Sequence, residues 1–211
     1  MSVLPPNASK IGVSESLYRS TRVREILVWP NPILSQPCED VTEFDDELGQ
    51  LVMDMCLTMA SGNGVGLAAP QVGVNKNIIT IGFPKHYALD NGSDYTGPTE
   101  YGNSFIDYKV MINPRILNTG ERQWEHEEGC LSVPGYFEKR KRPSEITVEY
   151  QLPNERWDSV QLQGLEAFAV QHELDHLNGK LFIDDLSRLK KDRVKKKVKK
   201  ALRDPLYPVA I

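Results

Sequence analysis

The stretch LEAFAVQHELDHLNG, residues 165–179, would form the centre of the fold. It predicts a helix that ends at Gly179 and carries two histidines, His172 and His176, with three residues between them. Positions i and i+4 lie one above the other on the same face of a helix. Both imidazoles can therefore point at one metal ion.

Glu173 directly follows the first of these histidines. Its carboxylate could accept a proton from a water whose pKa a metal ion lowers from ~15.7 to ~7. The alternative is an amphipathic helix that carries two histidines without a metal. The chain has only four histidines, so such a chance pairing should be rare, and the metal-binding helix is favoured.

A catalytic metal of this kind usually has three protein ligands, and this helix offers two. One protease pattern places a histidine three residues after the glycine, but Phe182 stands there. Another takes a downstream glutamate, and no glutamate follows His176. Asp184 and Asp185 remain as candidates, although their position just beyond the helix favours turn or capping roles.

The upstream candidates are two histidines and three cysteines. Cys130 is favoured because it lies in the turn-like stretch EEGCLSVPG and a thiolate is a strong ligand for Zn²⁺ or Fe²⁺. Cys38 and Cys56 are simply explained as structural thiols, since free cysteine is often a small buried hydrophobe. His86 and His126 lie in polar stretches, where we expect solvated side chains.

The rest of the chain predicts an α+β domain, with antiparallel sheets around the central metal-binding helix and further helices in the N-terminal half and at the C terminus. The glycine-rich segment 62–73 predicts a loop or tight turn, and the polar segment 84–108 predicts a long loop or a hairpin excursion. The other expected elements are a helix from about Thr42 to Gly62, strands at 77–83 and at 109–117 with an interruption at Pro114, a hairpin of 145–152 and 157–164, and a helix at about 186–203.

The chain has 211 residues, 40% of them hydrophobic, which suits one globular domain. We expect residues 1–21 to be a partly disordered extension and residues 22–211 to be a single catalytic domain. No apolar run approaches 18 residues, so the sequence predicts no membrane span. The odd number of cysteines argues against a disulfide framework and suits a reducing compartment.

Three segments together resemble the peptide deformylase family: GVGLAAPQ (64–71), EGCLS (128–132) and HELDH (172–176), in the family's order and spacing. The resemblance extends from about Val23 to the C-terminal helix. The stretch EGCLSVPGY and that helix are similar to the type found in many Gram-negative bacteria and in organelles. The family removes the formyl group from the N-terminal formyl-methionine of newly made proteins, so the resemblance implies a metal-dependent hydrolase.

The resemblance also implies roles for individual residues. Cys130, His172 and His176 would hold one divalent metal ion, Fe²⁺ in the cell, although Zn²⁺, Ni²⁺ or Co²⁺ could occupy the site. Glu173 would be the catalytic acid and base. The oxyanion that forms during hydrolysis would accept hydrogen bonds from the Gln71 side chain and from the Leu131 backbone N–H, although Gln71 on its own could be an ordinary loop residue.

The substrate would meet two further groups of residues. Leu165 and Phe168 share a helical face with His172 and would line the methionine pocket, with plain core packing as the alternative. The other expected contacts lie in the glycine-containing motifs: Gly64, Val65, Gly66 and Gly129.

The sequence departs from the family pattern at two places near the site, and one ion pair is expected there. Glu138 and Arg140 stand where the family commonly has small and apolar residues. The segment 84–108 is also long, and both features bear on the substrate entrance rather than on the chemistry. Asp175 points away from the two histidines, and the resemblance implies that it pairs with Arg142, because family members tend to have an arginine there.

The basic C-terminal segment is a local feature of an acidic chain. Residues 188–203 contain ten Lys or Arg and one Asp, a net charge of +9, whereas the whole chain carries −4. An interrupted apolar stripe suggests a helix that packs on the domain through the stripe and exposes its lysines to solvent. The alternative is a helix that binds ribosomal RNA. The stripe consists of Leu189, Val194, Val198 and Leu202.

We therefore expect a monomeric enzyme of the bacterial cytoplasm, with an organelle as the alternative location. Its partners would be formyl-Met nascent peptides and the ribosome, contacted through the basic helix at RNA or protein near the exit tunnel, with no membrane involved. Two rivals remain. One is a metalloendopeptidase, supported by the H-E-x-x-H helix alone. The other is an inactive ribosome-binding relative.

Overall fold

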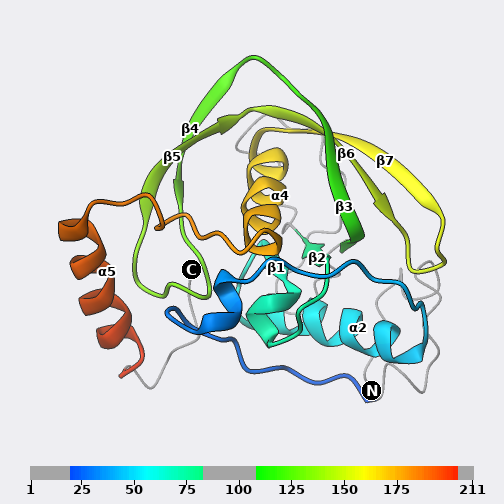
Figure 1. Cartoon of the computed structure of the whole chain (residues 1–211), viewed down its shortest axis with the longest axis horizontal. Helices are drawn as coiled ribbons and strands as arrows, with labels where there is room; N and C mark the ends of the chain where they lie inside the picture. The colour runs from blue at the N-terminus through cyan, green and yellow to red at the C-terminus, as the bar shows by residue number, and fades with distance from the viewer. Residues whose placement is uncertain (1–19, 83–107, 204–211) are drawn as a thin grey trace.

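A five-stranded antiparallel sheet, in the order β1-β2-β3-β6-β7, and a two-stranded ribbon, β4-β5, enclose a central helix, α4 (Figure 1). This computed structural model describes residues 20–82 and 108–203. The expectations for most of the N-terminal extension, for nearly all of the 84–108 segment and for His86 therefore lie outside the described residues. The α+β class and the central helix are as the sequence predicted.

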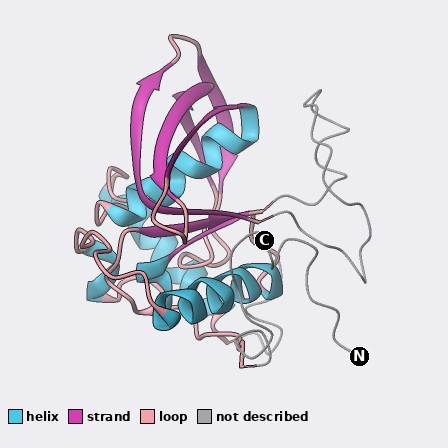
Figure 2. Cartoon of the chain, turned by 90° about the vertical axis from the view of Figure 1, so that its right-hand side faces the viewer, coloured by secondary structure: helices cyan, strands magenta, loops and turns pink. Residues whose placement is uncertain are grey.

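The described residues contain three α-helices, two short 3-10 helices and seven strands. The helices are η1 (Pro32–Ser35), α2 (Asp46–Ser61), η2 (Ala69–Val72), α4 (Gly164–Leu177) and α5 (Arg188–Ala201). The strands are β1 (Gly66–Ala68), β2 (Ile78–Ile81), β3 (Lys109–Thr119), β4 (Gln123–Glu128), β5 (Glu138–Pro143), β6 (Glu145–Gln151) and β7 (Trp157–Gln163). Seen from the side, the strands form a tall curved layer with most helices near its lower end (Figure 2).

Helices α2 and α4 cover opposite faces of the first three strands of the sheet. Alternation along β2 places Ile78 in the cluster beneath α2 and Ile79 in the cluster beneath α4. The pattern repeats in β3, where Val110 faces α2 and Met111 faces α4. These strands are therefore buried on both faces, and α4 is fixed at the centre of the molecule.

Helix α2 begins later than the sequence predicted. It starts at Asp46 rather than near Thr42, because the Asp45 side chain accepts a hydrogen bond from the Leu48 N–H at 2.9 Å and caps the helix there. Gly62 is the C-cap, as expected. The predicted stripe is correct, since all its members are buried: Leu48, Leu51, Val52, Met55 and Met59.

Strand β3 continues through Pro114, where the sequence predicted an interruption. The pairing with β6 shifts register between Ile112 and Arg115, so the missing N–H of the proline falls at an irregularity in the ladder. Asn113 has a φ of 51°. Its side chain accepts from the Val41 N–H at 2.8 Å and donates to the Val41 carbonyl at 2.9 Å, which stabilises this conformation.

Three strands, β1, β4 and β5, were not predicted from the sequence. The glycine-rich segment contains β1, which pairs with β2, so it is not only a loop. Strands β4 and β5 consist mostly of charged and polar residues, for example QWEHEE in β4. They therefore lack the alternation of apolar and polar residues that predicts a strand. The hairpin of β6 and β7 was predicted correctly.

Helix α5 packs on the loop after β4 through two valines. Val194 and Val198 are buried in a cluster that also contains Cys130 and Phe182. The predicted apolar stripe was wrong at its ends, since Leu189 is 67% exposed and Leu202 is 53% exposed. No helix in the described ranges is long and apolar enough to cross a membrane.

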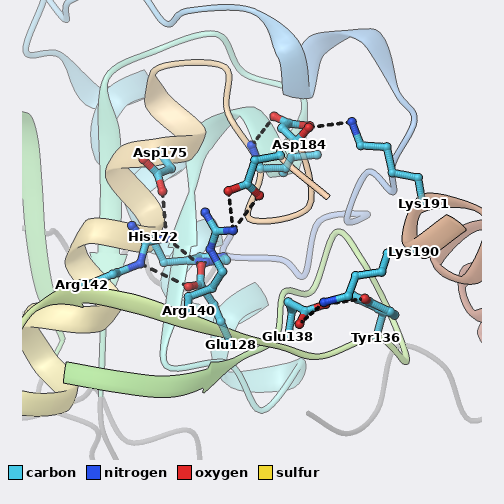
Figure 3. A network of polar contacts seen from close by, with 12 residues as sticks. Glu128, Tyr136, Glu138, Arg140, Arg142, His172, Asp175, Asp184, Lys190 and Lys191 are labelled. Carbon is cyan, nitrogen blue, oxygen red and sulfur yellow. Dashed lines mark hydrogen bonds and ion pairs between the residues drawn. The ribbon is translucent and has the colours of Figure 1, made fainter. Parts of the chain in front are cut away.

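Ion pairs from β5 complete the attachment of α5 (Figure 3). Lys190 Nζ lies 2.8 Å from Glu138 Oε1, and Tyr136 donates to the other oxygen of Glu138 at 2.7 Å. Arg140 pairs with Asp185 at 2.6 Å, just before the helix. The two residues that depart from the family pattern therefore hold the C-terminal helix against the ribbon.

Candidate metal centre

Cys130, His172 and His176 converge in the interior of the protein. One ligand atom from each lies within 4.8 Å of those of the other two, and all three residues are buried. Cys130 Sγ is 3.2 Å from His176 Nε2. Helix α4 supplies the imidazoles, and the turn after β4, closed by the Val133 N–H to Cys130 carbonyl bond at 2.9 Å, supplies the thiol. The third donor favoured from the sequence is thus beside the other two.

Glu128 orients His172 from the last position of β4. Its Oε1 forms a hydrogen bond with His172 Nδ1, which leaves Nε2 of the ring for a metal. The same carboxylate accepts from Arg142 at 2.8 Å and 3.2 Å. The sequence analysis assigned no role to Glu128, although this residue begins the EGCLS motif and lies two residues before the cysteine.

Arg142 also pairs with Asp175, as the family resemblance implied. Arg142 Nη2 is 2.8 Å from Asp175 Oδ2, so one guanidinium joins α4 to both strands of the ribbon (Figure 3). The Arg142 side chain is 11% exposed, which makes this a largely desolvated network. These contacts therefore hold helix α4 against the ribbon, beside the three candidate metal ligands.

The ionisable groups around the three ligands strongly perturb one another. Burial would raise the pKa of Glu128, but the hydrogen bonds and charges of His172 and Arg142 outweigh burial and lower this pKa to about 2. Burial opposes charge on His172, yet Cys130 and Glu128 raise its pKa well above the usual range. Burial and the neighbouring His172 lower the pKa of His176. The pKa values of the two imidazoles are therefore shifted in opposite directions.

Glu173 lies on the same helix and is 4% exposed. Burial raises the pKa of its carboxyl group to about 7. Strand β1 passes so close that a Cβ added at Gly66 would overlap Glu173 Oε1. Within the described ranges, Glu173 Oε2 and His176 Nδ1 are buried without a hydrogen-bond partner. Such atoms are unusual in a folded interior and often mark a functional site.

Gln71 reaches the site from η2. Its Oε1 accepts from the Ala68 N–H at 2.8 Å, which fixes the side chain against β1. Its amide Nε2 lies 3.1 Å from Ser132 Oγ and 3.5 Å from Cys130 Sγ. At 1% exposure, this is no ordinary loop glutamine, and its amide N–H groups point at the Cys130 turn.

The glycines of the two loop motifs allow close packing near the ligands. Leu131 is buried, and a Cβ at Gly64 would lie 2.9 Å from Leu131 Cδ1. A Cβ at Gly129 would overlap the Phe137 ring. Val65 is partly buried against the cluster beneath α4. Both loops therefore approach the site through positions that accept no larger side chain without rearrangement.

The two proposed pocket residues have different surroundings. Leu165 packs at the edge of the cluster beneath α4, which favours a core role for it. Phe168 is 3% exposed and contacts the rings of Trp124 and His126. His126 is therefore half-buried against aromatic rings, and the expectation of a solvated side chain was wrong. Phe182, which stands where one protease pattern has a histidine, packs 5.9 Å from the His172 ring.

The remaining candidate ligands have structural roles. Cys56 is buried in the core, and Cys38 is half-buried. Asp184 Oδ2 accepts from the Leu181 N–H at 2.7 Å and closes the turn after α4, as expected. Asp185 belongs to the ion pair with Arg140.

One sulfur and two imidazole nitrogens, buried together, form a donor set suited to Zn²⁺ or Fe²⁺. The orphaned oxygen of Glu173 beside them suits a proton acceptor. With three protein ligands, a fourth position would stay open for chemistry. The fold and the site thus define a metal-dependent hydrolase.

Comparisons with known proteins agree with this class. The sequence model of the polypeptide deformylase family matches residues 23–192. A peptide deformylase from Erythrobacter litoralis is 43% identical over 188 residues, covering 84% of this chain and 96% of the relative. One from Acidobacterium capsulatum is 40% identical, covering 86% of this chain and 96% of the relative.

Solved structures give the same result. The crystal structure of peptide deformylase from Ehrlichia chaffeensis is 39% identical, with a TM-score of 0.74, and covers 88% of this chain and 99% of that one. A Plasmodium falciparum peptide deformylase is 34% identical, with a TM-score of 0.64, and the match covers 85% of this chain and 99% of that one. The chain belongs to the peptide deformylase family, whose members are metal-dependent hydrolases that remove the N-formyl group from newly made polypeptides.

Proposed function

We propose that this chain deformylates formyl-methionine peptides with Cys130, His172 and His176 as metal ligands and Glu173 as the catalytic acid and base. The observation that carries the proposal is the convergence of the three donors beside the orphaned carboxylate oxygen. A divalent ion held there would act as a Lewis acid that lowers the pKa of a water ligand. We infer Fe²⁺ as the ion in the cell, because a mixed thiolate and imidazole set suits it, with Zn²⁺, Ni²⁺ or Co²⁺ as substitutes.

Glu173 moves the proton in this scheme. Its Oε2 takes a proton from the attacking water and passes it to the amine nitrogen of the methionine. The formyl C–N bond breaks, formate leaves, and the peptide keeps a free N-terminus. Gly66 supports this role, because any side chain at that position would overlap the Glu173 carboxylate and displace it.

Gln71 and Leu131 stabilise the oxyanion that develops during hydrolysis. The Gln71 amide is held by Ala68 and directed toward the Cys130 turn, so it is a preorganised donor. Leu131 directly follows Cys130 and would offer its backbone N–H. A single preorganised donor of this kind contributes about 3–4 kcal/mol to transition-state stabilisation.

The substrate would approach along the glycine-containing loops. Gly66 lies against the Glu173 carboxylate, Gly64 and Val65 directly precede it in the chain, and Gly129 directly precedes the thiol ligand. Phe168 lies one helical turn before His172 and is the better-placed wall of the methionine pocket. Leu165 would contribute only at the edge of that pocket.

Two substrates separate this function from that of an endopeptidase. Metal-loaded protein is incubated with a formyl-Met peptide and with a peptide that offers only internal bonds. The proposal predicts formate release and an intact chain. Internal cleavage without formate would favour the endopeptidase, and no reaction with either peptide would favour an inactive relative.

We also infer that α5 docks on the ribosome. Apart from Lys190 and Lys191, its basic side chains are exposed, a distribution suited to an RNA backbone. Truncation is a poor test, because Val194 and Val198 belong to the core. Replacing Lys195 and Lys199 by Glu should instead abolish co-sedimentation with ribosomes at low salt.

The matched control replaces two exposed lysines of β5, Lys139 and Lys141, by Glu. This control should leave co-sedimentation unchanged. Equal binding by both double variants would exclude α5 as the docking surface.

We further propose a monomer of the bacterial cytoplasm. Three free cysteines suit that reducing compartment. Light scattering of the purified protein would test the monomer, since a dimer would double the mass.

A further inference from the structure

A cavity of about 540 Å³ lies between the N-terminal segment and the ends of two helices. Its walls come from residues 23–28, from the C-terminal end of α2 and from Leu202 at the end of α5. The N-terminal segment, in blue, runs below α2 toward the side on which α5 lies (Figure 1). The three candidate metal ligands do not line this cavity, so it is separate from the metal centre.

The apolar side chains around the cavity are accessible to solvent. Val23 and Leu202, which are far apart in the sequence, are each 53% exposed. Ile26, Leu27 and Val28 are half-buried along the same wall as Val23. Covering such a group of side chains removes apolar surface from water, which is favourable. The cavity therefore suits an apolar occupant.

The backbone of this wall offers unused hydrogen-bond donors. The N–H groups of Arg22 and Arg24 donate to two side chains of α2, at 3.0 Å and 2.8 Å. Such alternate bonding is the pattern of an extended chain, so the N–H groups of Val23 and Glu25 point away from α2. Within the described residues, neither of these two N–H groups takes part in a hydrogen bond. An extended segment in the cavity would supply carbonyl acceptors for them.

The sequence beyond α5 provides a segment of matching chemistry. Leu202 is the C-cap of α5 and lines the cavity, so the chain leaves the helix at the cavity rim. The next part of the sequence, residues 204–211, lies outside the described residues and reads DPLYPVAI. Its two prolines disfavour a helix and favour an extended backbone. Leu206 follows Leu202 by four residues and can therefore lie up to about 13 Å from it.

We propose that residues 204–211 dock in this cavity, with Leu206 and Tyr207 against the apolar wall of residues 23–28. Docking within one chain avoids the entropic cost of bringing two molecules together. The two prolines also reduce the conformational freedom that the segment loses when it docks. The C-terminal segment would thus cover the exposed side chains of the wall.

The covered wall lies behind the two loops of the candidate site. The Leu27 N–H donates to the Gln71 carbonyl at 2.8 Å, and the Trp29 N–H donates to the Ser132 carbonyl at 2.8 Å. The first loop carries the proposed oxyanion donor, and the second carries the thiol ligand. A docked C-terminal segment would therefore join α5 to the part of the chain on which both loops rest.

Amide hydrogen exchange of the full chain, followed by NMR, tests this docking from both sides. The double variant Leu206→Asp, Tyr207→Asp places charges where apolar contacts are proposed. Exchange at the Val23 and Glu25 amides should be at least about tenfold faster in this variant than in the wild type, because burial of one such side chain favours docking by that factor.

The reciprocal variant changes the cavity and leaves the C-terminal segment intact. Val23→Asp replaces an exposed apolar side chain of the wall, and the Leu206 and Tyr207 amides should then exchange as fast as those of an unstructured peptide. Leu189→Asp is the matched control, since it is the same kind of change at an exposed position of α5 that does not line the cavity. It should leave both sets of exchange rates unchanged.

The possible results separate the occupants of the cavity. Wild-type Leu206 and Tyr207 amides that exchange as fast as an unstructured peptide would overturn the proposal, as would unchanged rates at Val23 and Glu25 in the double variant. Protection that increases with protein concentration would assign the cavity to a second copy of the chain and would also overturn it. These measurements do not depend on formate release, so their outcome is independent of the proposed function.

Discussion

Arg142 Nη2 lies 2.8 Å from Asp175 Oδ2, and this contact joins the metal-binding helix to a strand of the ribbon. The same guanidinium neutralises Glu128, whose side chain is 3% exposed. The geometry makes Arg142 the residue on which the placement of both His172 and the ribbon depends.

Replacing Arg142 by Ala should destabilise the metal-free protein by about 3 kcal/mol, because it leaves a buried carboxylate with one partner fewer. Chemical denaturation measures this change, and the rate of metal loss to a chelator should rise in parallel. Arg115→Ala is the control, since its pair with Asp40 is exposed at 3.5 Å and should contribute at most about 1 kcal/mol. Unchanged stability and metal retention in Arg142→Ala would contradict this account.

Replacing Gly66 by Ala should lower kcat while the metal is retained. The added Cβ would overlap Glu173 Oε1 and displace the carboxylate, and a shift of about 1 Å at a catalytic group can reduce turnover by about 10²-fold. In Gly64→Ala the added Cβ would lie 2.9 Å from the flexible end of Leu131 and 3.3 Å from the Gly66 carbonyl oxygen, with no contact to Glu173, so this variant should have a milder effect. Full activity of Gly66→Ala, measured by formate release at equal metal content, would mean that Glu173 needs no exact placement.

Alkylation of the folded protein should distinguish its structural thiols by pH. Burial, and then the charge of Glu39, raise the pKa of Cys38 to about 11. Because a raised pKa reduces the thiolate fraction, only about one Cys38 in a thousand is reactive at pH 8. Its labelling rate should climb about tenfold per pH unit from pH 8 to pH 10.

Cys56 should resist alkylation over the whole of this range. Complete burial raises its pKa to about 12, and the reagent cannot reach it without unfolding. Mass spectrometry of the labelled peptides measures both rates. Labelling of Cys56 as fast as Cys38 in the folded protein would show that the core cluster beneath α2 opens readily.

The predictable elements of the fold are those in which apolar residues recur at the spacing of a helix or a strand. The stripe from Leu48 to Met59 predicted α2, and alternation predicted the hairpin of β6 and β7. The ribbon was not predictable in this way, because Glu125 and Glu127 alternate with Trp124 and His126 rather than with aliphatic residues. The start of α2 was misplaced because a single cap, Asp45, decides it.

The candidate site was predictable where one segment holds several of its residues, as α4 does with His172, Glu173 and His176. The convergence of Cys130 followed from eliminating downstream ligands and from the family resemblance. Glu128 was missed because it meets His172 across 44 positions in the sequence, and no local pattern encodes that contact. Long-range polar contacts of this kind depend on how the ribbon packs against the helix.

We propose that Glu173 carries the proton at a metal site built by Cys130, His172 and His176. The decisive experiment measures formate release from a formyl-Met peptide by Glu173→Ala, at a metal content verified as one ion per chain, with Glu166→Ala on the first turn of the same helix as control. Turnover should fall by about 10²- to 10⁴-fold in Glu173→Ala alone, with the metal retained. Full turnover in that variant would rule out this role for Glu173.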